Sequence, residues 1–261
     1  MRRCGGEPLP NVAIDTKDKI WYFPFGYVRT EKGGEKMTVA AIVREQPHRA
    51  LLNLLNMFDR QAENLLKKNY HLSVGMDKEL FQKTWFKPLL NSLVRYYEQP
   101  DNLLLDYGLR VPFLIVFPHT FIPRATQLSM ITWVGLRKSP ILKLKEPIAD
   151  RMTRSAKPYI ALDVDPGTQL QGFSVDESIQ QINIQARGGL TLDEGIALAT
   201  HYPEILFNHG IDLPGSLTND GLTPYIQEKN NGIVVSKHFP DVPSKDRFGS
   251  ASLSGMLVFK K

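Results

Sequence analysis

The stretch from Lys157 to Phe207 decides the fold, and it reads KPYIALDVDPGTQLQGFSVDESIQQINIQARGGLTLDEGIALATHYPEILF. Its apolar run Tyr159–Val164 predicts a buried strand, which Asp165-Pro-Gly ends because these residues favour the backbone angles of tight turns. Ser174 and Thr191 then begin two helices, since each is followed three residues later by a glutamate, as in a capping box. The stretch therefore predicts one strand, a turn and two helices with marked starts.

The ends of these two helices are marked as well. We expect the first helix to run to about Gln185 and Gly188-Gly189 to stop it, because glycine is common just after a helix C-terminus. Pro203 ends the second helix, since proline lacks the backbone N–H that a continuing helix needs.

The chain before this stretch begins with helices. Apolar residues recur at spacings of three and four from Leu51 onward, which predicts a helix over 47–70. Asp77 can cap a second helix, which Pro88 kinks or ends. Together these segments predict an N-terminal helical hairpin.

Strands are predicted after Pro100. Val111–Phe117 is a candidate buried strand, and Gln127–Val134 alternates as a half-buried strand does, although a helix over Ala125–Trp133 stays open. Asn231-Gly232 indicates a type I′ hairpin turn, and Leu253–Phe259 is a candidate last strand. The fold class expected is α+β, an N-terminal helical hairpin followed by a mixed β-sheet flanked by the two capped helices.

Residues 1–36 differ from the rest of the chain. The codons of Lys32–Met37 can form a purine-rich sequence directly before a start codon, as a bacterial ribosome-binding site does. Our hypothesis is that Met37 is the native start and that 1–36 is a non-native leader. A genuine N-terminal arm is the alternative, and 37–261 is expected to be a single α+β domain in either case.

The bulk composition indicates an ordinary globular protein. The chain has 261 residues, 32 Lys+Arg against 27 Asp+Glu and a net charge of +5, which permits contact with nucleic acid without demanding it. Its one cysteine, Cys4, excludes an intramolecular disulfide and a cysteine-rich metal site. The N-terminus has no apolar signal-peptide core and no apolar run is long enough to cross a membrane. We therefore expect a cytoplasmic protein without membrane contact.

Two segments of the central stretch resemble a known family. They are PYIALDVD at 158–165 and LTLDEGIALATHYPE at 190–204, and the likeness extends over roughly residues 57–253. On these residues the chain is similar to a bacterial family catalogued as domain of unknown function 5701. The family carries a tryptophan-rich segment in its last third, whereas Trp21, Trp85 and Trp133 lie earlier here. The resemblance implies no activity, because the family has none assigned.

Four acidic and histidine residues are candidates for catalysis. Asp163 and Asp165 stand two apart on a strand, so both side chains should point to one face and could hold Mg²⁺ or transfer protons. The alternative is that Asp165 simply starts a turn. Glu194 and His201 could share one helix face with Glu204, and acidic neighbours would raise the pKa of the histidine. The alternative for His201 is a structural role at the helix C-terminus.

Basic residues concentrate between 137 and 157. This segment either is a solvated rim or binds a protein or nucleic-acid partner. Its candidate binding residues are Arg137, Lys138, Lys143, Lys145 and Arg151.

Known catalytic motifs are missing from the sequence. It has no Gly-x-Ser-x-Gly, no Walker A and no His-Glu-x-x-His. The favoured function is therefore a non-enzymatic binding or interaction protein of the bacterial cytoplasm. The alternative is an enzyme of unknown reaction in which Asp163, Asp165, Glu194 and His201 meet in one cleft. No cofactor is predicted.

Overall fold

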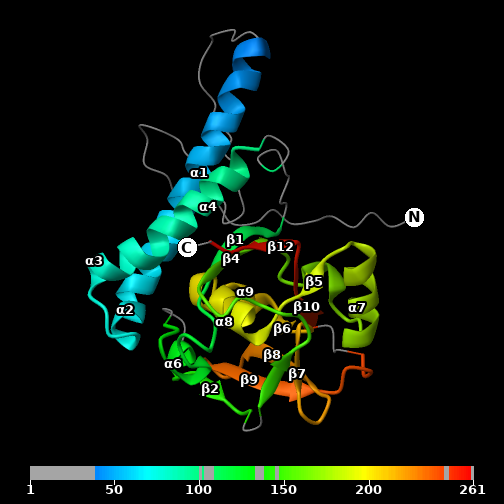
Figure 1. Cartoon of the computed structure of the whole chain (residues 1–261). Coiled ribbons are helices and arrows are strands. Elements are labelled where there is room, and N and C mark those ends of the chain that lie inside the picture. Colours follow the sequence, from blue (N-terminus) through cyan, green and yellow to red (C-terminus); the bar gives the residue numbers. More distant parts are fainter. Residues whose placement is uncertain are drawn as a thin grey trace, which may run out of the picture.

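The computed structural model describes residues 39–99, 102, 109–132, 138–144, 147–243 and 247–259, with side chains from residue 49 onward (Figure 1). The segment 1–36 lies outside the described residues. Within the described ranges, no helix combines the length and the apolar character that crossing a membrane requires.

A helical layer forms the N-terminal part, and its long first helix rises away from the rest of the protein in Figure 1. The first helix begins earlier than predicted, so Pro47 lies within it. Asp77 caps a helix as predicted, the one that begins at Lys78, because its side chain accepts from the Leu80 N–H at 2.7 Å. At Pro88 the helix continues, because a π-helical segment precedes it and widens the turn that proline would otherwise disrupt. The elements are α1 (Val39–Lys67), α2 (Tyr70–Ser73), α3 (Lys78–Phe81), η1 (Gln82–Phe86) and α4 (Lys87–Tyr97).

A three-stranded antiparallel sheet packs under this layer. It consists of β1 (Val111–Val116), β4 (Tyr159–Val164) and β12 (Gly255–Leu257), in the order β1-β4-β12. One face of β1 and β4 packs against the N-terminal helices, and the other face packs in the core that contains the apolar residues of 192–199. Both faces are covered, which explains why β4 is apolar without alternation.

Gln61 of α1 completes the free edge of β1. Its Nε2 donates to the carbonyl of Phe113 at 2.9 Å, and its Oε1 accepts from the N–H of Ile115 at 2.8 Å. The Gln61 side chain is buried and takes the place of a neighbouring strand. This contact satisfies two buried backbone groups that would otherwise lack partners.

A five-stranded mixed sheet lies on the opposite side of the molecule. Its strand order is β10-β6-β8-β9-β2, with parallel pairs at both ends and antiparallel pairs between them. Two short ladders, β3 with β7 and β5 with β11, join the remaining segments. The bounds are β2 (Ile141–Leu142), β3 (Ile148–Asp150), β5 (Gly188–Gly189), β6 (Gly210–Asp212), β7 (Ser216–Thr218), β8 (Thr223–Glu228), β9 (Ile233–His238), β10 (Phe248–Ser250) and β11 (Ser252–Leu253).

Three strand predictions can be compared with these sheets. The predicted hairpin is confirmed, but its central residues are Asn230 and Asn231, with φ of 56° and 61°, and not Asn231-Gly232. Asparagine tolerates this left-handed region, so the turn needs no glycine at its centre. The segment Leu253–Phe259 forms no single strand, because β11 and β12 pair with different partners.

The strand prediction for Gln127–Val134 is wrong. Helix α6 (Arg124–Ser129) occupies the first part of this segment, as the alternative allowed. The buried side chain of Gln127 donates to the carbonyls of Phe117 and Ile122 at 2.9 and 2.7 Å. Gln127 therefore faces inward with its polar group satisfied, from within a helix and not from a half-buried strand.

The two capped helices form as predicted. They are α7 (Val175–Ile184) and α8 (Leu192–His201), and both capping boxes are complete. In Figure 1, α8 runs between the two sheets and α7 lies at one side. All residues of α8 before His201 are buried. The α+β class is confirmed; the remaining helices are the 3₁₀ turn η2 (Thr168–Leu170) and α9 (Ile205–Asn208).

Helix α7 ends at Ile184, and the turn that ends it is made by Ala186 and not by Gly188-Gly189. Ala186 has φ of 52°, its N–H donates to the carbonyl of Asn183, and the Arg187 N–H donates to that of Ile182. This is a Schellman ending with alanine in the left-handed position that glycine usually fills. The two glycines instead form β5.

We expect Ala186→Gly to raise the free energy of unfolding by about 1 kcal/mol, because an L-residue with a side chain is strained at positive φ. Ala186 is exposed, so little packing is lost. Urea unfolding measures the change. Gln185→Gly, one residue earlier at negative φ, is the control and should not stabilise the protein.

Candidate functional site

The N-terminus of α8 collects polar side chains from four other segments. His119 comes from the loop after β1, Arg124 from the start of α6, Asp150 from the end of β3 and Ser216 from β7. They surround Asp193, in the first turn of α8. His119 and Arg124 contact Asp193 directly. Asp150 lies near Arg124, and Ser216 donates to Asp150. The cap at Thr191 fixes where this first turn begins.

Asp193 is held from both sides. Its Oδ2 accepts from the backbone N–H of His119 at 2.9 Å and lies 2.7 Å from His119 Nδ1. Its Oδ1 accepts from Arg124 Nε at 2.6 Å. The side chain of Asp193 is 5% exposed, that of Arg124 10% and that of His119 40%, so the imidazole is the most exposed of these three groups.

Asp150 completes the cluster from the opposite side. Its Oδ1 accepts from the Ser216 hydroxyl at 2.7 Å, and the Ser216 oxygen in turn accepts from the Leu192 N–H at 2.9 Å. Arg124 Nη2 lies 3.7 Å from the same Asp150 oxygen, which is too long for a hydrogen bond. The guanidinium therefore lies between two carboxylates.

A second ion pair lies next to Asp193 in the sequence. Arg154 Nε donates to Glu194 at 2.8 Å, and the Tyr159 hydroxyl donates to the same oxygen at 2.9 Å. Glu194 is completely buried and also accepts from the Thr191 N–H. Arg154 follows β3, whose last residue is Asp150, so its ion pair with Glu194 fixes this part of the chain to the start of α8.

The local charges set the protonation of the cluster. The hydrogen bond to Asp193 raises the pKa of His119. Burial opposes the ionisation of Asp193, but the His119 hydrogen bond and the charge of Arg124 outweigh it, so the pKa of Asp193 lies below its usual value. Burial raises the pKa of Asp150, against the hydrogen bond from Ser216. The arrangement favours ionised Asp193 beside protonated His119.

Such an arrangement can transfer protons. The Nδ1 of His119 faces Asp193, so Nε2 is the ring nitrogen left to exchange a proton with a ligand. His119, Asp150 and Asp193 also place ligand atoms within 4.8 Å of one another, close enough to hold a metal ion. Arg124 already lies between the two carboxylates, so a metal ion would have to compete with its positive charge.

The structure gives Asp163 and Asp165 different roles. Asp163 has φ of 50° within β4, and its Oδ2 accepts from Arg110 and Arg187 at 2.8 and 2.5 Å. Asp165 accepts from the Gly167 N–H at 2.8 Å and so closes the turn, as the alternative proposed. The two carboxylates share no partner among the described residues.

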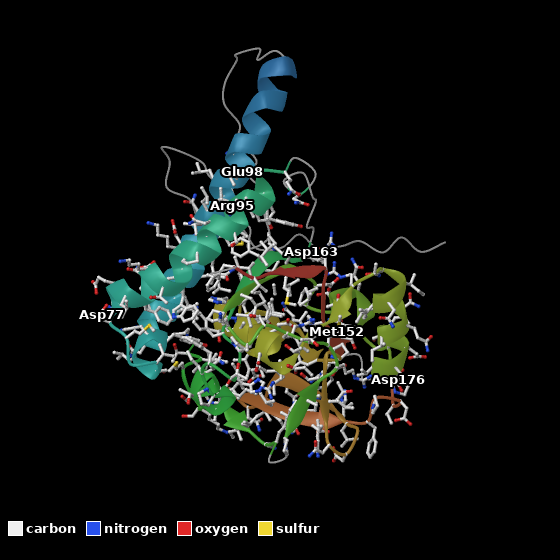
Figure 2. The ribbon with its side chains drawn as sticks, in the orientation of Figure 1. Asp77, Arg95, Glu98, Met152, Asp163 and Asp176 are labelled. Carbon is white, nitrogen blue, oxygen red and sulfur yellow. The ribbon has the colours of Figure 1, made fainter. Side chains whose placement is uncertain are left out.

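Glu194 and His201 lie at opposite ends of α8. Glu194 contacts Arg154 and Tyr159, whereas His201 Nδ1 lies 3.3 Å from the amide nitrogen of Asn64. Figure 2 labels Asp163 beside β12, apart from Met152, whose sulfur contacts Arg154. The four predicted catalytic residues therefore occupy separate surroundings within the described structure.

The predicted rise of the His201 pKa is wrong. Burial of the ring lowers this pKa to about 3, and Nε2 is inaccessible to solvent. Helix α8 ends at His201, so Glu204 is not on the same helix. His201 is neutral at ordinary pH and packs against α1.

We expect this neutral histidine to make stability fall in acid. A histidine with a lowered folded pKa binds protons mainly when unfolded, so its contribution is lost as pH falls below about 6.5. The loss should reach about 2 kcal/mol at pH 5. Urea unfolding of wild type and His201→Gln between pH 7 and 5 checks this. Parallel curves for the two proteins would contradict it.

The predicted basic residues lie partly outside the described residues, which include neither Arg137 nor Lys145. Lys138, Lys143 and Arg151 are exposed. The backbone N–H groups of Lys138 and Lys143 donate to the β8–β9 turn and to β9, which fixes both residues at the edge of the five-stranded sheet. Arg154, from the same basic segment, is used in the ion pair with Glu194.

Sequence reasoning missed His119, Arg124, Asp150 and Asp193 as a site. One signal was present, since Asp193 follows the Thr191 cap in the first turn of a helix. His119 follows a predicted buried strand, and polar residues just after a buried strand often lie near polar residues at a helix start. No spacing in the sequence pairs these two positions.

Comparison with known proteins gives one match. Residues 64–224, more than half of the chain, match a family of unknown function, DUF5701. The matched range contains His119, Arg124, Asp150, Asp193 and Ser216. No curated protein and no solved structure matches the chain.

Proposed function

The chain belongs to the DUF5701 family of unknown function, and we propose that it is an enzyme that uses His119 for acid–base catalysis. The single observation that carries the proposal is the hydrogen bond between His119 Nδ1 and a buried carboxylate, with the imidazole 40% exposed. A histidine held in this way presents Nε2 to a ligand in a fixed orientation.

The roles follow from the contacts. Above its pKa the imidazole of His119 is neutral, and it then takes a proton from water or a substrate hydroxyl and later returns it to a leaving group. Asp193 is a positioning residue, because it fixes the imidazole tautomer and stabilises the charged ring. Arg124 and the first turn of α8 keep Asp193 ionised. Hydrolysis is the simplest reaction that these groups support.

Turnover of nitrophenyl esters and phosphoesters by His119→Gln tests the proposal. We expect any turnover by wild type to fall about 100-fold or more, the usual contribution of a general acid or base. His238→Gln is the matched control, because His238 also pairs with an aspartate, Asp212, at 3.1 Å. Equal turnover in His119→Gln and wild type would overturn the proposal.

A second measurement separates positioning from folding. Asp193→Asn should shift the acidic limb of the pH–rate profile to lower pH, because the pKa of His119 falls when Asp193 loses its charge. A variant that loses activity through misfolding would show no such shift.

The second candidate is a binding protein, and the exposed Lys138, Lys143 and Arg151 favour it. Two of these residues are fixed at a sheet edge, where a polyanionic protein or nucleic acid could contact them. Affinity purification at low salt, with and without nuclease, tests this function. A partner lost at high salt and in Lys138→Glu/Lys143→Glu would support it, since phosphate contacts weaken steeply with salt. A partner retained in both conditions would contradict it.

A further inference from the structure

Arg124 has a buried donor nitrogen that the cluster does not use. Its Nε donates to Asp193, whereas its Nη2 is buried and makes no hydrogen bond to any residue that the structure describes. The Arg124 side chain is 10% exposed, so bulk water does not readily supply an acceptor. An unsatisfied donor on a buried charged group is costly, and native structures rarely retain one without a reason.

Ser216 explains why Asp150 does not take this donor. The Ser216 hydroxyl donates to Asp150 Oδ1 and is itself fixed by the Leu192 N–H. Asp150 is therefore held 3.7 Å from Arg124 Nη2, close enough for charge attraction but too far for a hydrogen bond. The structure keeps the donor next to His119 without an acceptor.

We propose that Arg124 Nη2 and the His119 imidazole together bind a carboxylate or phosphate group of the ligand of this site. The inference rests on the proposed function and names its substrate class. Arg124 and His119 contact the two oxygens of one carboxylate, Asp193, so the two side chains meet at that residue. Guanidinium and imidazolium donors suit an oxyanion, because their hydrogen bonds are charge-assisted.

The charges of the cluster couple this binding to proton uptake. Arg124, Arg154 and protonated His119 balance Asp150, Asp193 and Glu194. A bound anion would add one negative charge to these six side chains, and one additional proton would restore the balance. Asp150 lies 3.7 Å from Nη2 and burial already raises its pKa, so we expect Asp150 to take up the proton. Glu194 does not compete for it, since Arg154 and Tyr159 hold that carboxylate.

Titration with acetate and with inorganic phosphate tests the proposal. The ring resonances of His119 are followed by NMR in wild type, Arg124→Lys, Arg124→Gln and the control His238→Gln. We expect saturable shifts in wild type and in His238→Gln, and a dissociation constant raised about tenfold or more in Arg124→Gln. The dissociation constant of Arg124→Lys should lie between those of wild type and Arg124→Gln, because lysine keeps the positive charge but lacks the several N–H donors of the guanidinium.

The pH dependence uses acetate, whose own charge is constant over the range. Uptake of one proton should tighten acetate binding by up to about tenfold for each unit by which the pH falls. Shifts that do not saturate with either anion would overturn the inference, as would equal affinities in wild type and Arg124→Gln. Arg124→Lys, which keeps the cation beside Asp193, decides the question if Arg124→Gln fails to fold.

Failure of this inference and failure of the proposed function can be told apart. Anion binding through Arg124 with turnover that His119→Gln leaves unchanged overturns only the acid–base function. Loss of turnover in His119→Gln without binding of either anion overturns only the ligand class.

Discussion

We expect Gln61→Leu to lower the free energy of unfolding by about 3 kcal/mol. The substitution keeps a side chain of similar size but removes both groups that complete the edge of β1. The carbonyl of Phe113 and the N–H of Ile115 are then left buried without partners, at a cost of about 1–3 kcal/mol each. Urea unfolding measures the loss.

Glu63→Leu is the matched control for Gln61→Leu. Glu63 lies on the same helix, but its side chain is 65% exposed and pairs with Lys67, one turn away. An exposed pair of this kind contributes little, so the control should change stability by less than about 1 kcal/mol. Equal effects of the two substitutions would show that Gln61 does not support the sheet edge.

We also expect Arg154→Met to lower the free energy of unfolding strongly. This variant removes the positive partner of Glu194, which is completely buried, while the methionine keeps much of the side-chain volume. Breaking a buried pair by removing one partner typically costs about 3–5 kcal/mol, because the other charge is left uncompensated. Thermal and urea unfolding should both report the loss.

A second substitution and the pH dependence of stability test whether the unpaired charge of Glu194 causes the loss. Glu194→Gln in the Arg154→Met background should recover much of the lost stability, since it removes the unpaired charge and keeps a capping side chain. Burial raises the pKa of Glu194, so the unpaired carboxylate is protonated as pH falls. Wild type and Arg154→Met should therefore converge in stability toward acid and diverge as pH rises. A difference independent of pH would contradict this explanation.

Local signals predicted the central part of the fold well. Both capping boxes and the Asp77 cap involve residues within three positions of one another, so the sequence contains all the groups that form them. The segments 158–165 and 190–204 likewise sufficed to identify the family. These features depend on neighbours along the chain and not on the tertiary structure.

Predictions failed where tertiary contacts decided the outcome. Gln127 alternates as a strand residue does, but its amide satisfies carbonyls of the preceding loop from within a helix. Ala186 ends α7 although two glycines follow shortly after it. For Gln127 the local preference was weak and the packed surroundings determined the backbone, whereas at Ala186 the helix ends through hydrogen bonds to its own last turn.

The candidate site could not be read from the sequence for the same reason. His119 and Asp193 are far apart in the chain and meet only because β1 leads to the N-terminus of α8. His201, in contrast, had suggestive neighbours in sequence, yet the end of α8 separates it from Glu204. Proximity in the sequence therefore drew attention to His201, and the contact between His119 and Asp193 became visible only in the structure.

The pKa of His119, measured by NMR titration of its ring in wild type and Asp193→Asn, tests the acid–base site most directly. The structure predicts a wild-type pKa above the usual value of 6.5, because the imidazolium donates to Asp193. In Asp193→Asn the pKa should fall toward or below 6.5, since the negative partner is lost. A His119 pKa that is ordinary in wild type and unchanged in the variant would contradict the acid–base site.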